Sequence, residues 1–482
     1  MNISNKSLLK ASSIGLDVLS RNCSLKKSAL FIPNRIRTNI TPSVDPYLNI
    51  TKTLTPIVDD MQQSLSKRIQ RNGYDLKDII KSADRLNQIE WEEARLFEIR
   101  DQTRILISEE KDQSKIEKLK EDAKELKESL KKLRNERWEI EETTLIEYVR
   151  LPNTIHENTP MSSEDEIIFH IGDKPEIVNQ NLVRSHHELC HKEIEFSENS
   201  PTSYYLFGDV AKLEMSLNWA AQDFLLSNGF QMCAGPDFTR SAIVEGCNPD
   251  INLFQENNDD ERVFSLAPTS DFGDISTHAA THLVGSASFE SLISHYIKNV
   301  IINSTTSLPQ AYFCCGRSYS PVENRDKTLE SLYNVQQSSA VEFISIAKNA
   351  SSLDDQMKDI ECKIKKFYSG IGLHCLLIRR HVGKLEHAGK SMKISVMIYS
   401  PYGEKYVEVG CLNVYSDFVS RRLLTLYEDE VELGCLYILN GTFMNVTKMV
   451  GCVIENCQVE KSNINEVQLK QSITAFIKNI SP

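Results

Sequence analysis

The sequence has no apolar run approaching the roughly 18 residues that would indicate a membrane-spanning helix. Its twelve cysteines include no C-x-x-C pair, which argues against a zinc ribbon and against a secreted disulfide framework. We therefore expect reduced thiols and no membrane role. With 482 residues, 40% hydrophobic and 25% charged, the composition is that of a soluble protein with two or three domains.

Acidic residues are nearly absent from the first forty positions, where Asp17 stands alone against seven Lys and Arg, with seven serines interspersed. This composition predicts a mitochondrial transit peptide over residues 1–45, and the alternative is a disordered basic tail. Removing the first forty residues, which have a net charge of +6, would leave the rest of the chain at about −18 instead of −12. Such an acidic protein is not a general nucleic-acid binder, so any RNA contact must be local.

Residues 75–145 contain no proline or glycine, and their apolar positions step by three and four, which predicts a coiled-coil seam. The polar stretch 109–114 suits a turn between two antiparallel helices. We assign residues 46–150 to a helical arm and 151–482 to a second domain. The seam residues in the second helix are Ile116, Leu119, Ala123, Leu126, Leu130 and Leu133.

The sequence His187-Glu188-Leu-Cys-His191 matches the H-E-x-x-H pattern of zinc peptidases, in which two imidazoles on one helical face hold the metal. The pattern is short and no third-ligand motif follows it. His278 and His282 have the same spacing. We predict that neither pair holds a metal and keep a zinc peptidase as a minor alternative.

The second domain alternates strand-like runs with polar turns and a few helices. An amphipathic helix is predicted over residues 211–226, and strands over 310–315, 394–399 and 406–414. A further strand, 436–439, is expected to pass through a tight Asn440-Gly441 turn into a helix whose N-terminus could hold a phosphate. This pattern predicts an α+β fold, an antiparallel sheet with flanking helices.

The stretch after that strand resembles motif 3 of class II aminoacyl-tRNA synthetases in its seryl form, with Asn440-Gly441-Thr442 and Glu455-Asn456-x-Gln458 in place. The junction Leu151-Pro-Asn-Thr-Ile-His-Glu-Asn-Thr-Pro160 is similar to the one that joins the helical arm of seryl-tRNA synthetases to their catalytic domain. The resemblance implies a class II synthetase-like domain over 151–482.

Helix 211–226 and the following Gly-Phe and Pro-Asp pairs resemble motif 1, which forms the two-fold interface of the family. The resemblance therefore implies a dimer. The expected interface residues are Leu213, Leu217, Phe224, Gly229, Phe230 and Pro236.

The helical arm of the family grips tRNA-Ser, and the resemblance makes Arg95, Arg100 and Arg104 candidate contacts. Between Lys77 and Glu147 there are 16 Lys and Arg but 20 Asp and Glu, so phosphate neutralisation would depend on a few residues. The alternative is a hairpin used for protein contact.

Several positions that the family uses for chemistry are changed. The motif 2 arginine on the ATP α-phosphate is replaced by Ser320, and Arg317 three residues earlier is expected on the opposite face of its strand. The motif 3 arginine on the γ-phosphate is replaced by Lys448, and Ser288 stands where a carboxylate binds the serine amino group. The altered positions are Ser286, Ser288, Ser320, Asn334, Ser338 and Lys448. The retained positions are Glu342, Glu408, Arg421, Arg422, Asn440, Gly441 and Thr442.

Each lost ligand of a preorganised site is worth roughly 2–4 kcal/mol, so together these changes would abolish turnover. The chain resembles a non-catalytic paralogue of mitochondrial seryl-tRNA synthetase, which implies no catalytic residue and no cofactor. It further implies a heterodimer with the active enzyme in the matrix, tRNA-Ser bound through the partner or the arm, and contact with the protease Lon. The alternative is a divergent, active serine-tRNA ligase.

Overall fold

The computed structural model describes residues 28–30, 50, 54–68, 74–110, 112–177, 179–197, 200–249, 263–266, 280–302, 307–321, 331–429, 433–458 and 464–480. Apart from residues 28–30, the expected transit peptide 1–45 lies outside them, as does His278. Contacts divide the chain into two units: one includes Gly73–Arg150, the other Leu151–Pro482 together with Asp59–Asn72. No helix among the described residues is long and apolar enough to cross a membrane.

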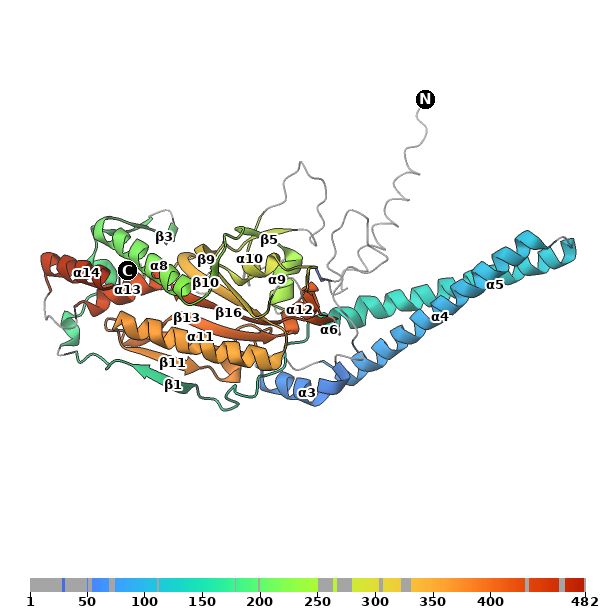
Figure 1. The fold of residues 1–482 in the computed structure, drawn as a ribbon, viewed down its shortest axis with the longest axis horizontal. Helices are drawn as coiled ribbons and strands as arrows, with labels where there is room; N and C mark the ends of the chain where they lie inside the picture. Colours follow the sequence, from blue (N-terminus) through green and yellow to red (C-terminus); the bar gives the residue numbers. More distant parts are fainter. Residues whose placement is uncertain are drawn as a thin grey trace, which may run out of the picture. The chain divides into compact units, whose positions relative to one another are not determined.

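The smaller unit contains the predicted helical hairpin (Figure 1). Asp75 and Asp112 accept hydrogen bonds from the first turns of its two long helices, α4 and α5, and fix their starts. Of the seam residues expected on α5, only Leu130 is buried. The arm is therefore less tightly packed near its tip, where α4 ends and α5 begins, than near Leu76 and Ile140, where the hairpin begins and ends. The elements are η1 (Thr55–Ile57), α4 (Leu76–Glu109), α5 (Gln113–Ile140), η2 (Glu141–Leu145) and α6 (Ile146–Val149).

The larger unit is built on an eight-stranded sheet in which every neighbouring pair is antiparallel except β4 and β9. The predicted α+β architecture is confirmed. In spatial order the strands are β1 (Glu166–Ile171), β11 (Cys375–Arg379), β12 (Met392–Ser400), β13 (Lys405–Ser416), β16 (Tyr437–Asn445), β10 (Gln337–Ala347), β9 (Gln310–Tyr319) and β4 (Gln231–Met232). The smaller sheets comprise β2 (Ile194–Ser197) and β3 (Ser200–Leu206), then β5 (Phe238–Arg240), β7 (Thr281–Leu283) and β6 (Phe264–Ser265), then β15 (Leu433–Cys435), β14 (Leu426–Glu428) and β8 (Val300–Ile302).

Helices α8, α11 and α13 pack on one face of the large sheet and form the main core with it (Figure 1). Phe313 of β9 and Phe343 of β10 point into this core, so residues that alternate with them face the other side of the sheet. The helices are α3 (Val58–Lys67), η3 (Gln180–Leu182), α7 (His186–Leu189), α8 (Gly208–Ser227), α9 (Ser241–Cys247), α10 (Phe289–Ser294), α11 (Ala350–Ile371), η6 (Val382–Lys384), α12 (Phe418–Leu423), α13 (Val446–Asn456) and α14 (Glu466–Ile480).

One local prediction is wrong. Asn440 and Gly441 do not form a turn, because β16 runs straight through them to Asn445 and pairs with both β10 and β13. A Cβ atom on Gly441 would clash with the carbonyl oxygen of Cys411 on the neighbouring strand. The glycine is therefore required for a close approach of strands and not for a reversal of the chain.

Candidate functional site

The polar face of the large sheet brings several retained residues together. The side-chain amide of Asn440 donates to Glu342 over 2.9 Å and to the Phe343 carbonyl over 2.9 Å. Glu342 is buried, and this burial raises its pKa to about 7, although hydrogen bonds from Thr442 and Asn440 favour the ionised form. Glu342, Asn440 and Thr442 therefore lie together, around a carboxyl group whose pKa is about 7.

This carboxyl group should make folding stability depend on pH. Since the pKa of Glu342 rises from 4.5 to about 7 on folding, the contribution is complete below pH 4.5 and is lost as pH increases through 7. Its full size is about 3 kcal/mol. We expect the difference in unfolding free energy between the wild type and Glu342→Gln to decline over this interval. Urea titrations at several pH values would show it, and parallel curves for the two proteins would contradict it.

The retained Glu408 belongs to a charged cluster on the neighbouring strands β12 and β13. Lys393, whose side chain is 2% exposed, lies 2.8 Å from Glu408 and 3.0 Å from Glu386. Arg380 also pairs with Glu408, over 3.2 Å, and Ser395 donates a hydrogen bond to it. Burial alone would raise the pKa of Glu408, but the charge of Lys393 and the hydrogen bonds from Lys393 and Ser395 together lower it. The Glu408 carboxylate is thus neutralised by the protein itself.

Two altered positions have structural roles. Ser288 caps α10: its hydroxyl accepts from the Ser291 N–H over 3.2 Å and donates to the Gly285 carbonyl over 2.7 Å. The backbone N–H of Ser286 donates to Asp237 over 2.8 Å. Neither serine offers a carboxylate to an ammonium group.

The altered positions of motifs 2 and 3 lie near strand and helix ends. Ser320 and Asn334 are exposed, and Ser338 accepts a hydrogen bond from Asn445 over 3.3 Å. Asn445 also caps α13 by accepting from the Lys448 backbone N–H over 3.0 Å. A side-chain acceptor of the protein therefore occupies the capping position where a phosphate was expected.

Arg317 lies on the opposite face from Glu342, as predicted from strand alternation. Its guanidinium donates to the Tyr204 hydroxyl over 3.0 Å and to the Ser339 hydroxyl over 2.8 Å, and it lies 3.6 Å from Glu214 of α8. These bonds commit Arg317 to the helical side of the sheet. It cannot replace the missing motif 2 arginine without breaking them.

The retained pair Arg421 and Arg422 supports neighbouring elements. Arg422 is buried and donates to the carbonyl groups of Glu245 and Gly246 at the end of α9. Arg421 pairs with Asp417 over 3.1 Å. These contacts hold α9 and α12 in place.

The prediction of the dimer-interface residues is wrong for most of them. Leu213 and Leu217 are fully buried in the core of their own chain, Phe230 packs edge-on against Phe343, and Phe224 stacks on Phe443. Only Gly229 and Pro236 are exposed; Gly229 has φ +86° and ends α8. The exposed apolar stripe of α8 consists instead of Met215, Trp219 and Leu226. Because α8 is apolar on both sides, spacing alone did not distinguish the two stripes.

The H-E-x-x-H pattern does not form a zinc helix. Helix α7 ends at Leu189, before His191, and Glu188 closes a capping box with Ser185. The described residues contain no group of three or more His, Cys, Asp and Glu placed to hold a metal. His282 is buried and hydrogen-bonds Ser241 and Ser265, and burial lowers its pKa to about 4.

The histidine that matters structurally is His186, which the sequence reasoning missed. Its Nδ1 lies 2.7 Å from the carboxyl of Glu455 on α13, and its Nε2 accepts the Leu332 N–H over 3.0 Å. Ser400 donates to the other oxygen of Glu455. All of these side chains are buried, so the network connects the segment before β10 with the motif 3 helix.

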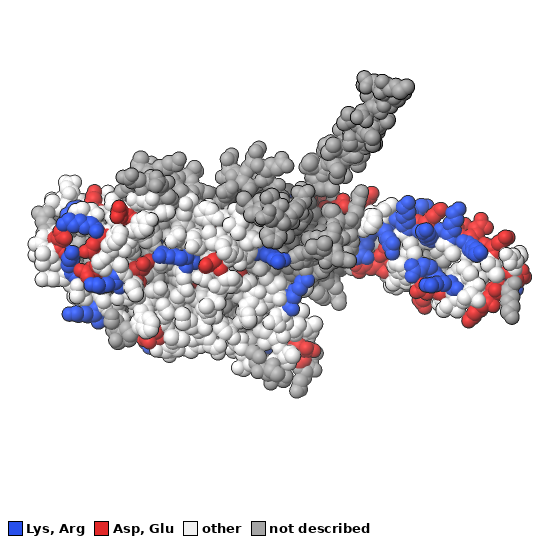
Figure 2. Space-filling model, turned by 90° about the horizontal axis from the view of Figure 1, so that it is seen from above, with Lys and Arg blue, Asp and Glu red and all other residues white. Residues whose placement is uncertain are grey.

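On the arm, two of the candidate arginines have local partners. Arg100 pairs with Asp101 and lies over Phe97, while Arg95 lies over Trp91. Arg104 is exposed. Basic and acidic side chains are interspersed over the arm (Figure 2).

A second set of cations on α5 steps by four, three and four along one side of the helix. None of its members forms an ion pair with the described part of the chain, and all are exposed. The same 3/4 spacing that revealed the seam could have revealed this stripe. The members of this lysine stripe are Lys120, Lys124, Lys127 and Lys131.

Part of the chain matches a known domain family, and most of it matches a solved fold. Residues 280–457 match the family model for the tRNA synthetase class II core domain (G, H, P, S and T). The fold covers 87% of this chain and 97% of the seryl-tRNA synthetase from Pyrococcus horikoshii solved in complex with ATP, at TM-score 0.72 and 17% identity. The larger unit thus has the fold of the class II aminoacyl-tRNA synthetases.

Its sequence is similar to a seryl-tRNA synthetase-like protein and to mitochondrial serine–tRNA ligases. It is 25% identical to the serine–tRNA synthetase-like protein Slimp of Drosophila melanogaster over 90% of both chains. It is 26% identical to the mitochondrial serine–tRNA ligase of Mus musculus, over 71% of this chain and 64% of the mouse protein.

Proposed function

We propose that this chain is a non-catalytic mitochondrial protein that binds and supports the mitochondrial seryl-tRNA synthetase as a heterodimer and so aids mitochondrial translation. The observation that carries the proposal is the state of the phosphate-binding positions. Ser320 and Asn334 stand where the family has arginines, and the nearby Arg317 is bound to Glu214 on the other face of the sheet.

Lys448 does not restore what has been lost. A guanidinium offers a planar fork that binds phosphate through two bonds, whereas an ammonium acts as a point charge. Ser288 caps α10 where the family has a carboxylate for the substrate ammonium. An adenylate-forming reaction needs both charges fixed in advance.

We predict that the purified chain shows no serine-dependent exchange of pyrophosphate into ATP. Lys448→Arg alone should leave the result unchanged, because Ser320 and Asn334 still leave the triphosphate without its other ligands. The active mitochondrial enzyme serves as the positive control. Exchange above background would instead favour a divergent, active serine ligase. The retained residues Glu342 and Asn440 are consistent with that alternative.

The proposed contact with the partner enzyme is the exposed stripe of Met215, Trp219 and Leu226 on α8. These side chains are 72%, 62% and 50% exposed in the single chain. Two-fold class II interfaces bury this helix against a second subunit, so a related enzyme of the same shape could cover it in a pseudo-symmetric pair. The mitochondrial location and contact with the matrix protease Lon belong to the same proposal and rest on the resemblance.

Direct tRNA-Ser binding by the arm is proposed to use the lysine stripe of α5 more than Arg95, Arg100 and Arg104. No carboxylate of the described residues pairs with this stripe, so its ammonium groups are available to phosphates. We predict that changing all four lysines to Gln lowers the slope of log affinity against log salt by up to about four. Filter binding over a salt series would measure it. Changing the three arginines to Gln is the matched control, and a larger effect there would reverse the assignment.

A further inference from the structure

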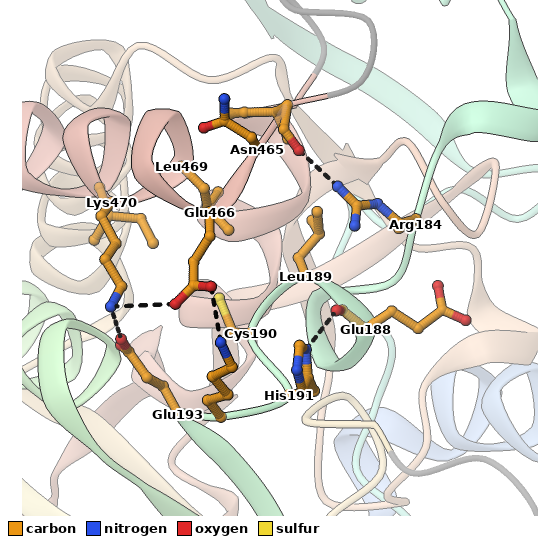
Figure 3. A pocket seen from close by; sticks show the side chains of 13 residues that line it. Arg184, Glu188, Leu189, Cys190, His191, Glu193, Asn465, Glu466, Leu469 and Lys470 are labelled. Carbon is orange, nitrogen blue, oxygen red and sulfur yellow. Dashed lines mark hydrogen bonds and ion pairs between the residues drawn. The ribbon is translucent and has the colours of Figure 1, made fainter.

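A cavity of about 220 Å³ lies between the α7–β2 segment and the C-terminal helix α14 (Figure 3). Helix α14 packs on α8 and α13, so the cavity is on the helical side of the sheet and not on the side of Glu342. None of the altered or retained motif positions lines it. The cavity is therefore separate from the synthetase-like site.

The floor of the cavity is apolar. It is formed by Leu189, Cys190, Ile464, Leu469 and Ile473, all of which are buried. Burial raises the pKa of the Cys190 thiol to about 12, so the thiol is neutral at physiological pH and adds to the apolar surface.

The rim of the cavity carries charged groups, most of which neutralise one another. Lys192 lies 2.9 Å from Glu466, and Lys470 lies 3.6 Å from Glu466 and 3.1 Å from Glu193. Glu188 is engaged in the capping box of α7, and its carboxylate points away from these side chains (Figure 3). The acidic groups of the rim therefore leave no uncompensated negative charge facing the cavity.

Arg184 is the exception. It donates to the Ile464 carbonyl over 2.7 Å, and its backbone is held on both sides by the amide of Gln458. Among the described residues, the guanidinium hydrogen-bonds this carbonyl and forms no ion pair with a carboxylate. A guanidinium held in this way, with free N–H groups at the mouth of an apolar cavity, is suited to a carboxylate.

We propose that this cavity binds a small aliphatic carboxylate, with its carboxylate on Arg184 and its hydrocarbon body on the apolar floor. The volume is below the roughly 300–1,000 Å³ of sites for drug-sized molecules, so the ligand is a small metabolite. A positively charged molecule would meet Arg184, and a fully apolar one would leave it without a partner.

Glu193 connects the cavity with the N-terminus of helix α8. Its carboxylate accepts from the N–H groups of Asp209 and Val210 and caps α8, whose own N-cap residue Phe207 supplies no side-chain bond. Glu193 is also part of the cavity wall and pairs with Lys470. Ligand binding should therefore slow amide exchange at the first turn of α8.

The test is a titration of the full chain with hexanoate, followed by calorimetry and by hydrogen exchange at Asp209 and Val210. We expect saturable binding, slower exchange, and no binding of hexylamine, which has the same body and the opposite charge. Arg184→Gln should weaken hexanoate binding roughly 10- to 100-fold. Lys478→Gln, at an exposed residue of α14 that does not line the cavity, should change it little.

Arg184→Lys keeps the charge without the fork and should retain part of the affinity, which separates a binding defect from a folding defect. Thermal melting of each variant checks that it is folded. Absence of hexanoate binding, equal binding of hexylamine, or full affinity in Arg184→Gln would each overturn the proposal. The outcome does not depend on the partner enzyme or on the synthetase-like site.

Discussion

Trp219→Glu should release the chain from mitochondrial seryl-tRNA synthetase while leaving it folded. Trp219 is 62% exposed on α8 and lies between Met215 and Leu226. At an interface such a tryptophan is a typical hot spot, and a carboxylate there would be buried without a partner. We expect the affinity to fall by about two orders of magnitude or more. Co-expression and size exclusion would show separate elution and lower serylation by the partner.

Two matched variants make this result specific. Val467→Glu on α14 introduces the same charge at an apolar side chain that is 65% exposed, and it should leave the complex intact. Leu217→Glu puts the charge on the fully buried stripe of α8, so it should unfold the chain instead of dissociating it. If Trp219→Glu still co-elutes one-to-one with full activity, this stripe does not join the partners. If it instead separates two copies of this chain, the partner is wrong.

The helical arm could be predicted closely because its information is local. The absence of proline and glycine, the 3/4 spacing and the polar break at 109–114 locate α4 and α5 almost to the residue. The antiparallel sheet was likewise predictable from strand-like runs and from the resemblance. These patterns do not show which face of a helix or strand packs against the rest of the protein.

Helix α8 shows why the interface residues were misassigned. Leu213 and Leu217 and the exposed pair Met215 and Trp219 are all apolar, so periodicity gives two equivalent stripes. Only packing against the sheet selects which stripe is buried. Similarly, the Asn440-Gly441 pair has the sequence of a turn, but pairing of β16 with two neighbours overrides that local preference.

The His186 network depends on residues that are far apart in the sequence. His186, Leu332, Ser400 and Glu455 come from four segments, and no spacing rule connects them. The metal-motif histidines His187 and His191 are not part of this network. The neighbouring His186, which matches no motif, is buried and belongs to it. Long-range polar contacts of this kind were not accessible from a single sequence.

This network leads to the prediction with the largest effect on stability. His186 is 2% exposed and Glu455 is completely buried, so His186→Leu would leave one oxygen of Glu455 and the Leu332 N–H without a partner. Removing one member of a buried pair costs about 3–5 kcal/mol, because the remaining group stays desolvated. Urea unfolding should show this loss, with a lower midpoint and an unchanged slope.

The same substitution five residues along the chain is the control. His191 is exposed, and among the described residues its ring hydrogen-bonds only the Glu188 carbonyl, over 3.4 Å, so His191→Leu should change stability by no more than about 0.5 kcal/mol. In His186→Leu/Glu455→Leu no carboxyl remains unpaired, and part of the lost stability should return, since the penalty comes from the orphaned group. Equal destabilisation in His186→Leu and His191→Leu would show that the network does not stabilise this fold.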